Sequence, residues 1–171
     1  ASLVIAEINP NMPVTHGETV IHLSSVDFIV ESDMPLIERE NKPYDEIMDR
    51  IGWNISNLIE DGATVALHVG RIFNAIADHL KQKKNLGILT HVVSDWAIDL
   101  IQSGAISLDR SRYTGGLITT CYCYGSRALY DYVHRNPIFE FYPIARLSNP
   151  FVVRRIKSLI GIMNVKKIDI S

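Results

Sequence analysis

The chain has 171 residues, of which 47% are hydrophobic and 21% are charged, and its formal net charge is −2 at neutral pH. Those proportions are ordinary for a soluble globular protein and supply enough apolar material for a sizeable core. A nucleic-acid-binding surface needs a strongly basic face, and a membrane-spanning helix needs ~20 consecutive apolar residues. The sequence has neither, so we expect one domain, or one domain and part of another, that binds no nucleic acid and no membrane.

The first 43 residues contain short apolar runs separated by polar or proline-containing stretches. Leu3–Ala6 is predicted to form a buried strand, and residues 9–13 end it because proline lacks the donor that a strand needs. Val20–Leu23 and Val26–Val30 are two further predicted strands. Residues 31–43 are polar, contain Pro35 and Pro43, and form the predicted linker.

From residue 44 onward, predicted helices and strands alternate. A first helix, ended near Gly62, is indicated by aliphatic residues that share one helical face: Ile47, Ile51, Ile55, Leu58 and Ile59. Apolar runs predict strands at Thr64–Leu67, Gly87–Val93, Leu117–Tyr124, Ile138–Phe141 and Leu159–Met163. Further helices are predicted around Ile72, Ile76 and Leu80, over Asp95–Gln102 with Ser94 as cap and Gly104 as end, and over Arg127–Arg135. This order predicts a mainly parallel α/β sheet with helices on both faces, and with the first three of these strands in its interior.

Several segments, in order along the chain, resemble the acetyl-CoA hydrolase/CoA-transferase family, which includes 4-hydroxybutyrate and butyrate:acetate CoA-transferases. Residues 6–17, AEINPNMPVTHG, are similar to that family's AEVNPNMPxTxG. Residues 55–64, ISNLIEDGAT, are similar to its ASLIEDGAT. Gly125-Ser126-Arg127, the following Leu-Tyr-Asp, Asn136-Pro137 and Glu140-Phe141 match its third region. Each match is weak alone, but the ordered set is specific.

The resemblance implies a layered, NagB/RpiA-like α/β fold of the CoA-transferase type. Residues 1–43 would then be the C-terminal tail of a first α/β domain together with the linker. Residues 44–171 would be most of the second, CoA-transferase-like domain. Apolar runs at both ends, including Ile168–Ser171, would leave strands that need pairing partners. A homo-oligomer or a partner chain is therefore expected to cover them.

The family's reaction, as the resemblance implies it, uses a glutamate as covalent nucleophile. The glutamate attacks an acyl thioester to form a mixed anhydride, CoA returns as thiolate to give a glutamyl thioester, and CoA then passes to a second carboxylate. The family's strand pattern MVxINSAxEVDL matches residues 159–171, and the match places Lys167 on the glutamate. An amine would form a stable amide at that step, so no catalytic residue is assigned. Lys167 is either a solvated side chain or an anion-binding cation.

A CoA-binding set is carried over from two further family patterns. In place of GIGxIP the chain has His68-Val69-Gly70-Arg71-Ile72-Phe73, in which Gly70 still permits a tight turn before a helix N-terminus that suits phosphate. Arg71 could add a bidentate contact. In place of HTExFSDG, residues 89–96 keep Ser94 and Asp95. Asn164, one position from the family's asparagine, completes the expected CoA-binding residues: Gly70, Arg71, Ser94, Asp95 and Asn164.

Other departures concern histidine, tryptophan and cysteine. His91 stands where the family has glutamate, and Trp96 where it has glycine, which would crowd a ligand channel unless the backbone has moved. His68 and His91 follow strands that could lie side by side, and are expected to be buried and hydrogen-bonded rather than acid–base groups. Cys121 and Cys123 share one face of a predicted strand, and no metal site is expected because no second ligand pair has matching spacing.

Two functions remain open on the sequence. The first is an acyl-CoA:carboxylate CoA-transferase or acetyl-CoA hydrolase, active within a larger chain or complex, with CoA as substrate and an acyl-CoA and a small carboxylate as partners. The second is a catalytically inactive relative that serves as a binding or scaffold subunit. Two cysteines make no disulfide framework, and the first residues lack the charged and apolar regions of a signal peptide, so the cytoplasm is the expected location.

Overall fold

The computed structural model describes residues 3–106, 118–156, 158–165 and 167–169. Its main sheet has six strands in the order β10-β4-β5-β7-β9-β2, and every pairing within it is parallel. In sheet order these strands are Leu159–Gly161, Thr64–Ala66, Gly87–Leu89, Ile118–Thr120, Phe139–Phe141 and His16–Gly17. The predicted parallel α/β sheet, with β4, β5 and β7 in its interior, is confirmed.

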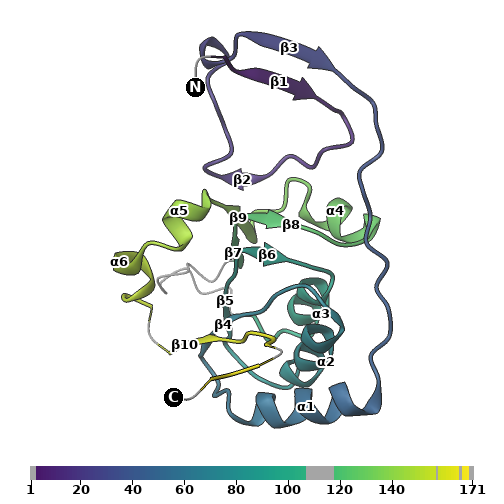
Figure 1. Ribbon diagram of the computed structural model, residues 1–171, viewed down its shortest axis with the longest axis vertical. Coiled ribbons are helices and arrows are strands. Elements are labelled where there is room, and N and C mark those ends of the chain that lie inside the picture. Colours follow the sequence, from purple (N-terminus) through teal and green to yellow (C-terminus); the bar gives the residue numbers. More distant parts are fainter. Residues whose placement is uncertain (1–2, 107–117, 157, 166, 170–171) are drawn as a thin grey trace.

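Helices cover both faces of this sheet (Figure 1). The helices α2 (Arg71–Leu80) and α3 (Trp96–Gln102) lie on one side, and the short helices α5 (Ile144–Leu147) and α6 (Pro150–Val153) lie on the other. The helices α1 (Glu46–Asn57) and α4 (Arg127–Val133) complete the set in the described residues. The sequence pattern predicted α3 and α4 to within two residues at each end and a helix at the place of α2, but it did not indicate α5 or α6.

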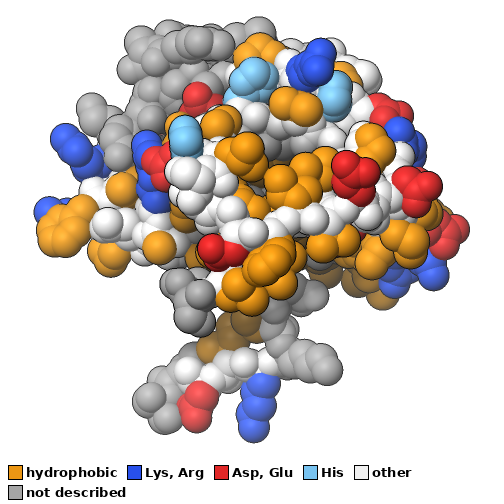
Figure 2. All heavy atoms as spheres, turned by 90° about the horizontal axis from the view of Figure 1, so that it is seen from above, with side chains coloured by type: hydrophobic (Ala, Val, Ile, Leu, Met, Phe, Trp, Pro, Cys, Tyr) orange, Lys and Arg blue, Asp and Glu red, His pale blue; other side chains and the backbone are white. Residues whose placement is uncertain are grey.

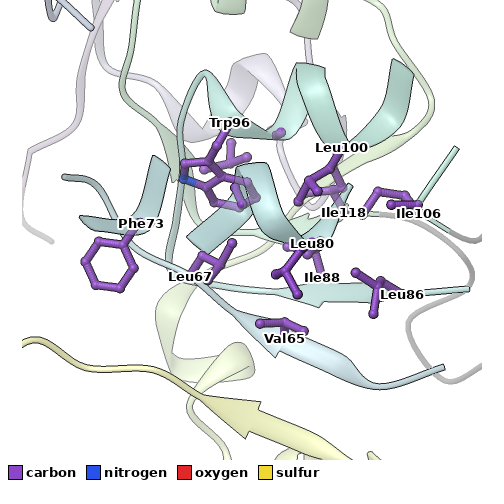
Figure 3. Close-up of a cluster of buried hydrophobic side chains, with 14 of the residues drawn as sticks. Val65, Leu67, Phe73, Leu80, Leu86, Ile88, Trp96, Leu100, Ile106 and Ile118 are labelled. Carbon is purple, nitrogen blue, oxygen red and sulfur yellow. The ribbon is translucent and has the colours of Figure 1, made fainter. Parts of the chain in front are cut away.

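The core lies between the sheet and the α2–α3 layer (Figure 3). Val65 and Ile88 are fully buried on adjacent strands, and Leu80 and Leu100 reach them from the two helices. Trp96 is 2% exposed, and its indole N–H donates to the His68 carbonyl at 3.0 Å. The tryptophan that was expected to crowd a ligand channel is therefore a core residue of α3.

Two of the predicted strands are interrupted. Gly87–Val93 divides into β5 and β6 (Val92–Val93), and Leu117–Tyr124 divides into β7 and β8 (Tyr122–Cys123), with Leu117 outside the described residues. β6 and β8 then pair in a separate parallel two-stranded sheet. At the first break the Thr90 hydroxyl lies within hydrogen-bond reach of the Leu67 carbonyl on β4's side and of the Val92 carbonyl at 3.2 Å. At the second break the Thr120 hydroxyl donates to the Tyr122 carbonyl at 3.1 Å. These local bonds compete with the strand ladder and bend the chain.

The segment before the linker differs from the prediction in two respects. β1 (Ile5–Ile8) and β3 (Phe28–Glu31) pair in parallel but are largely exposed, so the strand predicted to be buried is not buried in this chain. No strand forms at Val20–Leu23, where a 3₁₀ helix, η1 (Leu23–Ser25), follows. The His22 ring caps η1 by accepting from the Ser24 amide at 3.2 Å, which stabilises a turn instead of extended chain. Figure 1 shows β1 and β3 apart from the main sheet.

The helix α1 confirms the predicted face only in part: Ile59, just after the helix, is 1% exposed, and Ile55 packs against the core. Ile47 and Leu58 are exposed, whereas Gly52 and Ser56 are buried against α2. A Cβ on Gly52 would lie 2.8 Å from the Ala75 carbonyl, so glycine is what lets the two backbones approach closely. The helix also ends at Asn57 rather than near Gly62, whose positive φ of 83° serves the turn into β4. Close backbone packing thus shifts the buried face of α1 toward Gly52 and Ser56 and leaves Ile47 exposed.

Candidate functional site

A cavity of about 300 Å³ lies where β10, β4 and β5 end and the α5–α6 segment covers the sheet. Its wall is mainly aliphatic, with four polar side chains among its members. The lining residues are Ala66, His68, Leu89, Thr90, His91, Leu147, Ser148, Val153, Leu159 and Gly161. An apolar cavity with a few convergent polar groups is the usual form of a small-ligand site, and this volume is at the small end of the range.

The two histidines meet because of strand register. Val65 of β4 pairs with Ile88 of β5, and His68 and His91 each follow three residues later. The side-by-side placement predicted from the sequence is confirmed, but both rings are only half-buried. Burial lowers the pKa of His68, and the neighbouring His91 lowers it further. Both effects favour the neutral form of the His68 ring.

Each histidine has a defined contact. His91 Nε2 lies 2.9 Å from the Ser148 hydroxyl, which belongs to the residue that ends α5. His68 packs edge-on against Phe73, with ring centroids 5.6 Å apart. The hydrogen bond expected of a structural histidine is thus present at His91, but its partner is exposed and faces a cavity. Ser148 was missed from the sequence because nothing there indicated that residues 144–153 would fold over the strand ends.

Gly70 and Arg71 form the predicted turn into a helix. Gly70 precedes α2 with φ 147° and ψ 160°, a conformation that side chains disfavour, and its carbonyl accepts from the Phe73 and Asn74 amides at 3.1 Å each. Arg71 is exposed, and its Nη1 donates to the Pro43 carbonyl at 3.4 Å. The turn predicted for phosphate is therefore built as expected, although neither residue lines the cavity.

Ser94 and Asp95 are engaged in holding α4. The Ser94 hydroxyl, buried, donates to the Tyr124 carbonyl at 2.9 Å and does not cap α3 as predicted. The Asp95 carboxylate accepts from the Ser126 amide at 3.1 Å and from the Ser126 hydroxyl at 2.5 Å. A Cβ on Gly125 would come within 2.6 Å of that carboxylate. Two of the segments that carry the family resemblance thus meet at a structural contact.

Lys167 and Asn164 lie beyond the last strand. β10 pairs with β4, and the Ile162 amide extends that pairing by donating to the Ala66 carbonyl at 3.2 Å. Asn164 and Lys167 follow as exposed residues outside any helix or strand, and neither lines the cavity. None of the five predicted CoA-binding residues therefore lines the cavity.

The cysteines have thiols of low reactivity. Burial raises the pKa of Cys121 and raises that of Cys123 to about 11, so both remain protonated at neutral pH. Cys123 belongs to β8, whereas Cys121 lies at the break before it, so the single strand expected to carry both is absent. Within the described residues, no group of three or more His, Cys, Asp or Glu side chains is arranged to hold a metal ion. None of the described helices is long and apolar enough to cross a membrane.

Comparison with known proteins defines the class. Residues 125–171 match the acetyl-CoA hydrolase/transferase C-terminal domain. The 4-hydroxybutyrate coenzyme A transferase of Clostridium kluyveri is 38% identical over 170 residues, which are 99% of this chain and 40% of that protein. The succinyl-CoA:cyclohexane-1-carboxylate CoA transferase of Geobacter metallireducens is 34% identical over 99% of this chain and 39% of that protein.

Comparison with solved structures also finds CoA-transferases. The crystal structure of 4-hydroxybutyrate CoA-transferase from Porphyromonas gingivalis is similar with a TM-score of 0.86 at 34% identity, over 93% of this chain and 41% of that one. The predicted resemblance to the acetyl-CoA hydrolase/CoA-transferase family is confirmed along the whole chain. The chain spans about 40% of the length of the relatives that it matches.

Loss of the Asp95 carboxylate is expected to destabilise the fold. Asp95→Ala leaves the buried end of α4 without its acceptor and should lower the free energy of unfolding by about 1–3 kcal/mol. The control is Asp131→Ala, which removes an exposed ion pair with Arg127 and should cost less than about 1 kcal/mol. Urea denaturation of the two variants measures both values. Equal losses would mean that the Asp95–Ser126 contact has no special structural weight.

Proposed function

We propose that this chain is the central part of an acyl-CoA:carboxylate CoA-transferase or acetyl-CoA hydrolase, active only within a larger chain or complex. The observation that carries the proposal is the match to CoA-transferases over nearly the whole chain, at up to 38% identity. Residues 1–43 would be the tail of a first α/β domain and residues 44–171 most of the second. The substrates by this reading are an acyl-CoA and a small carboxylate.

CoA would contact the turn between β4 and α2. Three features support this: Gly70 has no side chain to block a ligand, the first turn of α2 has no side-chain cap, and the guanidinium of Arg71 beside it is exposed. Ser94 and Asp95 would act there only by holding α4, because their polar atoms are engaged in protein contacts. Asn164 is exposed on the segment after β10 and remains a proposed contact to CoA.

Arg71 is expected to strengthen CoA binding. Arg71→Ala should weaken binding by about 1–3 kcal/mol, the range for a hydrogen bond to a charged group. Exposed Arg50 of α1 supplies the matched control, since Arg50→Ala removes the same charge away from the turn. Calorimetric titration with CoA gives both affinities. Equal binding by the two variants, or no binding by the unaltered chain, would exclude this site.

The alternative function, a catalytically inactive relative that binds or scaffolds, is favoured by one position. Lys167 aligns with the family's glutamate, and an ammonium can form neither the mixed anhydride nor the thioester of the cycle. Loss of an obligate nucleophile costs many orders of magnitude in rate. Transfer through residue 167 is therefore not expected, and any turnover would require another carboxylate.

The two functions can be separated by trapping. After incubation with an acyl-CoA, the chain is treated with hydroxylamine or borohydride, and adducts are located by mass spectrometry. We expect no acyl or CoA adduct on Lys167 that depends on turnover. A covalent adduct on a nearby glutamate, with turnover above background, would show that a different carboxylate acts and would reject the inactive reading.

The β1–β3 segment is proposed to be covered by a partner, either another copy or the remainder of the first domain. Apolar side chains of this segment are exposed, among them Ile5 at 59% and Phe28 at 60%. Figure 2 looks onto the end of the molecule where this segment lies and shows apolar side chains at its surface. A covering partner would remove these side chains from water.

Self-association of the isolated chain tests this covering face. Sedimentation should show concentration-dependent dimers or larger species, and Ile5→Lys should shift them toward monomer by placing a charge in the apolar contact. Ile47→Lys on α1 also places a lysine at an exposed isoleucine and serves as control, because α1 belongs to the second domain. A chain that stays monomeric at all concentrations would contradict the proposal.

A further inference from the structure

We propose that His68, His91 and Ser148 form a subsite that selects short monocarboxylates over dicarboxylates and neutral analogues. The proposal rests on the proposed CoA-transfer function only for the choice of a carboxylate as ligand. Its physical basis is the cavity at the ends of β10, β4 and β5, in which these three side chains and Thr90 are the polar members of a mainly aliphatic wall.

The polar groups can supply hydrogen-bond donors to a carboxylate. A neutral imidazole carries one N–H, and the His91–Ser148 bond of 2.9 Å can run in either direction. When His91 donates from Nε2, the Ser148 hydroxyl proton is released to point at a ligand oxygen, and the linked bonds strengthen one another. His68, the next imidazole on the wall, offers a further N–H. A carboxylate accepts through both oxygens and suits this arrangement.

The charges of the site also favour an anion. Among the described lining residues, the two histidines are the only titratable side chains, and no carboxylate is present to repel a ligand. His68 has a lowered pKa because burial and His91 disfavour its charged form. A bound anion offsets both effects. The sequence adds that His91 stands where the family resemblance expects a glutamate, so an anionic wall position has become neutral or cationic.

The aliphatic wall sets the rest of the ligand. Leu89, Leu147, Val153 and Leu159 surround the space beyond the polar groups. A short hydrocarbon chain would be buried there favourably. A second carboxylate would meet that wall without a partner, which is costly. The cavity therefore suits acids of the size of butyrate and disfavours succinate, which has the same number of carbons and one more charge.

Calorimetric titration and histidine-ring NMR spectra of the full chain test the subsite without CoA. Butyrate is expected to bind and to shift the His68 and His91 ring resonances. Butyramide, its neutral analogue, and succinate should bind at least about tenfold more weakly, because each loses a charge-assisted bond or buries an unpaired charge. Inorganic phosphate is titrated as well, because it distinguishes selection of a carboxylate from binding of any small anion. Butyramide, succinate or phosphate binding as tightly as butyrate would overturn the proposal.

Variants place the binding in the cavity. His91→Gln and Ser148→Ala should each weaken butyrate binding about tenfold, while His22→Gln, the same change at an exposed ring of the η1 cap, should not. Ser148 is exposed, so its alanine variant is expected to fold, which thermal unfolding checks. Unchanged butyrate binding by folded Ser148→Ala and His91→Gln would reject the subsite. Butyrate binding without CoA binding would support the subsite and reject the proposed function. CoA binding without butyrate binding would support the proposed function and reject the subsite.

Discussion

The parallel pairing of β4 with β5 determines which side chains lie together where these two strands end. Because Val65 is opposite Ile88, the residues at equal distance beyond them, His68 and His91, emerge at the same end. Gly70 follows His68 by two residues and begins the turn into α2, so this histidine is close in sequence to the helix N-terminus. A slip of one residue would turn alternate side chains to the other face and separate the rings. The register of β4 and β5 therefore brings together the two histidines that line the cavity.

Sequence periodicity was enough for α2 and for five of the six strands of the main sheet, which lie in apolar runs, but it did not indicate the two-residue strand β2 (His16–Gly17). It failed where a single local contact outweighs the pattern. Two strands are interrupted where the Thr90 and Thr120 hydroxyls meet backbone carbonyls, and Gly52 lets α1 approach α2 closely because it has no side chain. Such choices depend on which backbone groups come close in three dimensions, which propensity does not encode.

The candidate site was predictable only in part for a related reason. The turn at Gly70 could be inferred because glycine before a helix has a local meaning, and the histidines could be inferred because both follow apolar strands. Ser148 could not, since its position depends on how the chain returns over the sheet after β9. A family pattern marked Ser94 and Asp95 as binding residues, which stays a prediction, but it did not indicate that their contacts with Tyr124 and Ser126 also serve the fold.

Nucleophilic catalysis and anion recognition make opposite electrostatic demands on such a site. A carboxylate nucleophile must remain charged and unpaired beside an incoming anion, which its own charge repels. Where the family resemblance expects glutamates, this chain has Lys167 and His91, and where it expects glycine it has His68. All three changes remove negative charge or add a group that can carry positive charge. All three changes agree with the proposed subsite, in which a bound carboxylate is held rather than repelled.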